Sequence, residues 1–64
     1  MEPYQQRVVE EKKELDERLS KLWNFLDTVD FSALLVAERA RMRMQAAIME
    51  NYSDILGERI EAFQ

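Results

Sequence analysis

The single proline and the single glycine of this chain stand at positions 3 and 57, so no strong helix breaker interrupts the sequence between them. Apolar residues in the first half of the chain recur at alternating spacings of three and four residues. This pattern is unbroken if the aliphatic stem of Lys12 is counted as apolar. Pro3 suits a first helical turn, where its missing N–H is not needed. The pattern predicts a helix over residues 3–29 with one coiled-coil-like seam, formed by Val8, Leu15, Leu19, Leu22, Leu26 and Val29.

Short polar side chains gather between residues 27 and 32, where Asp30 or Ser32 is expected to cap a new helix. We therefore predict a turn at residues 30–33 and a second helix over residues 34–62, in a single hairpin domain spanning residues 1–64. Because Gly57 lies inside this helix, it indicates a close approach of another segment. The second helix has two apolar stripes, one with Leu35, Met42, Met49, Tyr52, Leu56 and Phe63, the other with Ala37, Ala40, Met44, Ala47, Ile48 and Ile55.

Apolar surface in excess of what one hairpin can bury predicts self-association. Two long helices joined by a short link are antiparallel neighbours and need one stripe each, yet the second helix has two. The chain has 64 residues and no cysteine, so packing must supply its stability. Small residues such as Ala37, Ala40 and Ala47 allow another helix to approach closely. The predicted fold is all-α, an antiparallel helical hairpin assembling into a homo-oligomeric helical bundle from a four-helix dimer upward.

The composition argues against catalysis and against several classes of partner. Histidine and cysteine are absent, which removes Ser/His and Cys/His pairs and the commonest metal ligand. We predict no catalytic residue, no metal site and no cofactor. A formal net charge of −4 disfavours long nucleic acid. No apolar run approaches the roughly 20 residues needed to cross a bilayer and no signal-peptide pattern is present, so a cytoplasmic location is expected.

The start of the first helix is the segment most suggestive of ligand binding. Tyr4 offers an aromatic face and Arg7 a guanidinium, beside free N–H groups that favour an anion. A base stacked on Tyr4 with a phosphate at Arg7 is chemically sensible, while a frayed solubilising end fits the composition equally well. Other polar residues of the same helix can reach this segment only across a subunit interface: Lys12, Arg18, Ser20 and Lys21.

Four strings of the sequence carry a resemblance to a known family: Tyr4–Leu19 (YQQRVVEEKKELDERL), Leu22 with Phe25, Phe31–Leu34 (FSAL) and Tyr52–Leu56 (YSDIL). Over nearly its whole length the chain resembles the small phage helical-hairpin domain shared by anti-CBASS and anti-Thoeris sponge proteins. The resemblance implies a compact oligomer, hexameric in the anti-CBASS branch, in the cytoplasm of the infected bacterial host. It implies immune evasion by sequestering cyclic oligonucleotide second messengers, such as cyclic GMP-AMP, at subunit interfaces without cleavage.

The same resemblance implies roles for individual residues. In the anti-CBASS branch a residue near the N-terminus stacks on the base, and a cation and a hydroxyl from a neighbour's first long helix hold the ring and phosphates. The matching positions here are Tyr4, with Pro3 beside it, for the stack, Arg18 for the cation and Ser20 for the hydroxyl. A separate site for cyclic trinucleotides in that branch uses an arginine late in the second helix, which Arg59 fits.

Two other functions fit the residues. A small helical-hairpin dimer that binds RNA would cluster its lysines and arginines on one exposed face. An adaptor would bind a host protein helix through the surplus apolar stripe. Arg39, Arg41 and Arg43 fit interface ion pairs or solvent-facing positions, with a phosphate clamp shared between subunits as the less common alternative.

Overall fold

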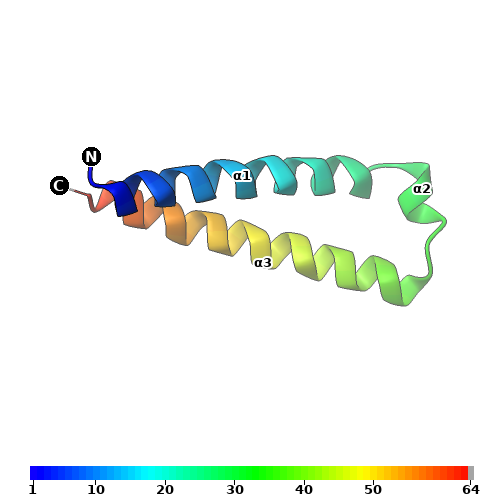
Figure 1. The fold of residues 1–64 in the computed structure, drawn as a ribbon. Helices are drawn as coiled ribbons and strands as arrows, with labels where there is room; N and C mark the ends of the chain where they lie inside the picture. The colour runs from blue at the N-terminus through cyan, green and yellow to red at the C-terminus, as the bar shows by residue number, and fades with distance from the viewer. Residues whose placement is uncertain (64) are drawn as a thin grey trace.

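The structure, a computed structural model, describes residues 1–63 as an antiparallel helical hairpin. Its elements are α1 (Pro3–Leu26), α2 (Val29–Ser32) and α3 (Val36–Glu61), and no strand occurs among these residues. The two long helices lie side by side, with the N- and C-terminal ends together and α2 at the opposite end (Figure 1). The Cα atoms extend over 47 × 14 × 13 Å. The predicted all-α fold and the long helix pair are confirmed.

The connection between the long helices differs from the prediction. The first helix was expected to reach residue 29 but ends at Leu26, and residues 29–32 form the separate helix α2 instead of belonging to a turn at 30–33. Thr28 causes the break, because its hydroxyl donates to the Phe25 carbonyl at 2.7 Å and accepts from the Phe31 N–H at 3.2 Å. Thr28 is therefore the cap of α2, and the predicted caps Asp30 and Ser32 lie inside that helix.

The aromatic ring of Phe31 holds α2 against the long helices. Phe31 is 3% exposed and packs edge-to-face on Phe25, with ring centroids 6.1 Å apart. The Arg43 guanidinium of α3 lies 5.0 Å from the centroid of the Phe31 ring, at cation–π distance. Val29, which the sequence placed in the seam, is 83% exposed because the chain has already left α1 there. The second long helix begins at Val36 and ends at Glu61, slightly inside the predicted 34–62.

The inner faces of both long helices follow a three–four spacing, but several of their residues are polar or small. The buried cluster consists of Val8, Leu15 and Leu56, with Met49, Ile60 and Phe63 packed against it. Ala46 and Ser53 of α3 and Gln5 of α1 are also buried, and apolar periodicity did not select them. Leu35 and Tyr52, which the sequence places in the same stripe as Leu56, are 81% and 42% exposed. The hairpin core is therefore narrow and concentrated toward the end that holds both termini.

The second predicted stripe of α3 remains uncovered in the hairpin. All of its residues are exposed, with Met44 at 64%, Ile48 at 62% and Ile55 at 53%. Trp23 on α1 is also 47% exposed. The expectation that one hairpin cannot bury all of its apolar residues is confirmed for residues 1–63.

Gly57 faces the Lys12 side chain, and a methyl group fits there. A Cβ built on Gly57 would meet the Lys12 Cε at 3.6 Å, an ordinary van der Waals distance. Alanine removes backbone entropy from the unfolded chain, so Gly57→Ala is expected to raise the free energy of unfolding by about 0.5–1 kcal/mol. Urea titration followed by circular dichroism measures this change. A loss of stability would show that α3 approaches α1 more closely than the structure indicates.

Candidate functional site

The first turn of α1 presents an aromatic ring at the end of the hairpin where both termini lie. Tyr4 is 52% exposed, and its ring packs edge-to-face on Phe63 with centroids 5.9 Å apart and an interplanar angle of 77°. The backbone here is ordered by a Glu2 N–H that donates to Gln5 Oε1 at 2.8 Å, and by Pro3 in the first helical position. Tyr4 is thus held in place by Phe63 while half of its surface stays accessible, beside the exposed Pro3 and Arg7.

The other predicted contact residues lie much farther along α1. Arg18, Ser20 and Lys21 are exposed, and Arg18 follows Tyr4 by 14 residues, about 21 Å along a helix axis. Within one chain, therefore, the structure does not bring these residues to Tyr4. Arg59 is exposed in the last turn of α3, at the same end of the hairpin as the start of α1 (Figure 1).

An open groove of about 500 Å³ runs along the side of α1 where it meets the C-terminal half of α3. Val9 and Ile60 are its apolar lining residues, and Ser20, which the resemblance assigns to ligand contact, also lines it. Val9 and Lys13 belong to the string Tyr4–Leu19 that carries the resemblance, but sequence reasoning gave neither of them a part in a groove. The remaining lining residues are Lys12, Lys13, Asp16 and Glu17.

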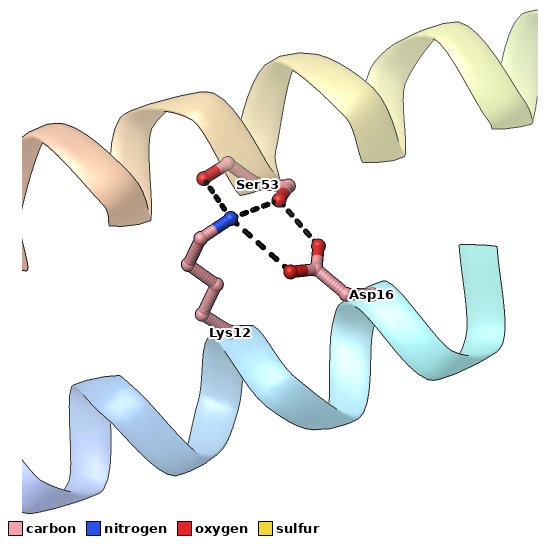
Figure 2. A network of polar contacts seen from close by, with 3 residues as sticks. All are labelled: Lys12, Asp16 and Ser53. Carbon is pink, nitrogen blue, oxygen red and sulfur yellow. Dashed lines mark hydrogen bonds and ion pairs between the residues drawn. The ribbon is translucent and has the colours of Figure 1, made fainter. Parts of the chain in front are cut away.

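A polar network at the inner edge of this groove ties α1 to α3 (Figure 2). The Lys12 ammonium donates to the Ser53 hydroxyl at 2.7 Å and to the Ser53 carbonyl at 3.3 Å. It also pairs with Asp16 Oδ2 at 3.2 Å, and the Ser53 hydroxyl donates to Asp16 Oδ1 at 2.5 Å. Lys12 therefore packs its stem in the seam, as predicted, while its charged end fixes the register between the helices.

Asp16 is held in its charged form by this network. The Ser53 hydroxyl contributes most to lowering the pKa of the Asp16 carboxyl below its ordinary value, and Lys12 lowers it further, against the opposing effect of burial. We interpret the network as a structural contact between the helices and not as a ligand site, because Lys12 and Asp16 are paired with each other and both are bonded to Ser53.

Acid should weaken this contact between the helices. A carboxyl whose pKa is lowered in the folded state contributes stability above its unfolded pKa of about 3.9, and loses that contribution as the pH falls through its folded pKa. The free energy of unfolding is therefore expected to fall more between pH 5 and pH 3 in the wild type than in Asp16→Asn. Urea titrations at the two pH values measure this difference. Equal losses in the two proteins would contradict the assigned role of Asp16.

Metal-binding clusters and membrane-spanning helices are both disfavoured by the sequence, and the described residues contain neither. Among residues 1–63, no three acidic side chains gather closely enough to hold a metal ion. In the same part of the chain, neither long helix has the length and apolar content required to cross a membrane.

The fold and the exposed aromatic and cationic residues define a small helical-hairpin protein whose polar groups suit ligand contact. The chain belongs to the Sequestin family, whose family model matches residues 2–62. Neither the curated proteins nor the solved structures contain a match to this chain. Membership confirms the resemblance to a phage sponge domain, and it indicates sequestration of a small-molecule ligand rather than catalysis.

Proposed function

We propose that this chain sequesters cyclic oligonucleotide second messengers at interfaces between its own copies, without cleaving them. The proposed assembly is a hexamer in the cytoplasm of an infected bacterium, where it lowers the free concentration of a cyclic dinucleotide such as cyclic GMP-AMP. The effector of host CBASS immunity would then remain inactive. A cyclic trinucleotide at a second site near Arg59 is part of the same proposal.

The observation that carries this proposal is the separation of exposed ligand-type residues along one hairpin. Tyr4 lies at one end of α1, and Arg18 follows it by about 21 Å of helix. A small ligand that uses both must take Tyr4 from one copy and Arg18 from another. The exposed apolar face of α3 supplies a reason for copies to associate.

The chemistry of a cyclic dinucleotide suits such shared sites. The ligand has two flat bases and two phosphate charges, so two copies related by a two-fold axis can offer two Tyr4 rings and two Arg18 guanidinium groups. Arginine matches phosphate oxygens with a planar pair of N–H donors. Assembly fixes these side chains before the ligand arrives, which lowers the entropic cost of binding. A few placed cations are sufficient, in keeping with the net charge of −4.

Isothermal titration against a panel of cyclic di- and trinucleotides tests the proposal. Linear dinucleotides and a cyclic ADP-ribose isomer serve as controls for the cyclic shape and the number of bases. We expect saturable heat with a cyclic dinucleotide, at fewer than one ligand per chain because each site is shared. Absence of heat with every cyclic nucleotide would contradict the proposal, and an RNA or a protein helix would then be the partner to seek.

A further inference from the structure

The outward face of α3 presents several apolar side chains that α1 does not cover within residues 1–63. Residues of this face recur on the side of α3 opposite Ala46, Ser53 and Leu56, which are buried against α1. A shallow hollow of about 280 Å³ lies beside it, lined by Arg41, Met44, Gln45, Ile48 and Met49. We call this surface the outer α3 face; it consists of Ala37, Ala40, Met44, Ala47, Ile48 and Ile55.

Small and large residues on the outer α3 face alternate in a way that suits a second copy running in the opposite direction. If two such helices cross near residues 47 and 48, Ala40 lies opposite the partner's Ile55 and Ala47 lies opposite the partner's Ile48. Ile48 and Ile55 then each meet an alanine, which lets the helix axes approach closely at these two contacts, and Met44 lies opposite the partner's Asn51. A parallel pair would instead place Ile48 on Ile48 and Ala40 on Ala40, leaving one contact crowded and the other empty.

The charges of α3 favour the same direction. Residues 36–46 contain three arginines against one glutamate, whereas residues 47–61 contain four acidic residues against one arginine. Glu38 in the first half already pairs with Arg41 at 3.1 Å. An antiparallel pair therefore brings the arginine-rich half of each copy, including Arg43, beside the acidic half of the other, including Asp54. A parallel pair would set like charges together.

We propose that a second copy of this chain docks on the outer α3 face, antiparallel, with the two-fold axis between Ala47 and Ile48. This inference deepens the self-association that the proposed function requires, and it concerns only how two copies meet. It leaves α1 of both copies outermost, so that Arg18, Ser20 and Lys21 stay accessible to further copies and to ligand. Three such pairs would make the proposed hexamer.

Engineered cysteines test the direction of pairing, because the chain has no cysteine of its own. A disulfide needs Cα atoms within about 7 Å of each other. In the proposed pair, Ala47→Cys meets its own copy at the two-fold axis, whereas Ala37→Cys is separated from its copy by about 30 Å of helix. Under mild oxidation we expect Ala47→Cys to form a disulfide-linked dimer at least tenfold faster than Ala37→Cys. Light scattering on the reduced variants reports whether assembly is unchanged.

Each other result would overturn the inference. Fast linkage of Ala37→Cys would mean a parallel pair, and slow linkage of both variants in an intact oligomer would mean that another surface holds the copies together. If the reduced variants were monomeric by light scattering, the proposed pair of copies would not exist. Because no nucleotide is used, linkage of Ala47→Cys together with silent nucleotide titrations would leave this inference standing while the proposed function fails.

Discussion

Leu56→Ala is expected to lower the free energy of unfolding by about 2–5 kcal/mol. Leu56 is 0% exposed and joins Val8 and Leu15 in the buried cluster, so its removal leaves a cavity between α1 and α3. A loss of this size approaches the whole stability of a domain with 64 residues. Chemical denaturation followed by circular dichroism measures it, at one fixed protein concentration because assembly also stabilises the fold.

Val29→Ala is the matched control for this truncation. The three–four spacing of the sequence assigns Val29 to the seam, but the structure leaves it 83% exposed at the start of α2. We expect its truncation to change the free energy of unfolding by no more than about 0.5 kcal/mol. If Val29→Ala destabilised the protein as strongly as Leu56→Ala, α1 would have to continue through residue 29, and the described turn would be wrong.

Tyr4→Ala is expected to weaken the binding of a cyclic dinucleotide by about 30-fold or more. Stacking of a base on an aromatic ring contributes about 1–3 kcal/mol, and a ligand held by two symmetry-related copies loses two such contacts. Tyr4→Phe keeps the ring and its edge-to-face contact with Phe63, so it should bind almost normally. Isothermal titration measures both affinities.

Light scattering on the Tyr4 variants separates ligand contact from packing. Tyr4→Ala should keep the size of the assembly, since Tyr4 lies at the end of the hairpin and away from the outer α3 face. Loss of the oligomer would make Tyr4 a structural residue, and unchanged binding in Tyr4→Ala would remove it from the site. Arg18→Ala should also weaken binding without changing the assembly, with Arg18→Lys retaining the charge but not the planar donors.

The hairpin could be predicted from the sequence because the residues that indicate its helices are spread over the whole chain. Pro3 marks the start of α1, and the three–four spacing of leucines from Leu15 to Leu26 identifies the inner face of that helix. The same method missed Gln5, Ala46 and Ser53, since an apolar pattern cannot detect a buried polar or small residue. Ser53 is buried because Lys12 and Asp16 reach it across the interface, which only the paired helices reveal.

The turn was misplaced for a similar reason. Asp30 and Ser32 are good capping residues by type, and nothing local to them excludes that role. The deciding contacts are the Thr28 hydroxyl bonds to Phe25 and Phe31 and the burial of the Phe31 ring. The burial of the Phe31 ring, together with the Thr28 hydrogen bonds, thus sets the position at which α1 ends and α2 begins.

The candidate site is harder to predict than the fold, because its proposed residues lie far apart along one chain. Tyr4 and Arg18 are separated along one rigid helix, and the residue types alone give no distance between copies. The resemblance to the sponge family, confirmed by the match over residues 2–62, is what connects them. The groove lined by Ser20 and Ile60 adds a surface that neither the residue pattern nor the family had indicated.

Recovery of intact ligand tests the central claim most directly. A cyclic dinucleotide is mixed with excess protein, free ligand is separated by ultrafiltration, and the retained protein is then denatured and its ligand analysed by anion-exchange chromatography and mass spectrometry. Sequestration without cleavage predicts depletion of free ligand before denaturation and full recovery of the cyclic dinucleotide afterwards. Ligand that stays in the filtrate, or that returns as a linear product, would contradict the account.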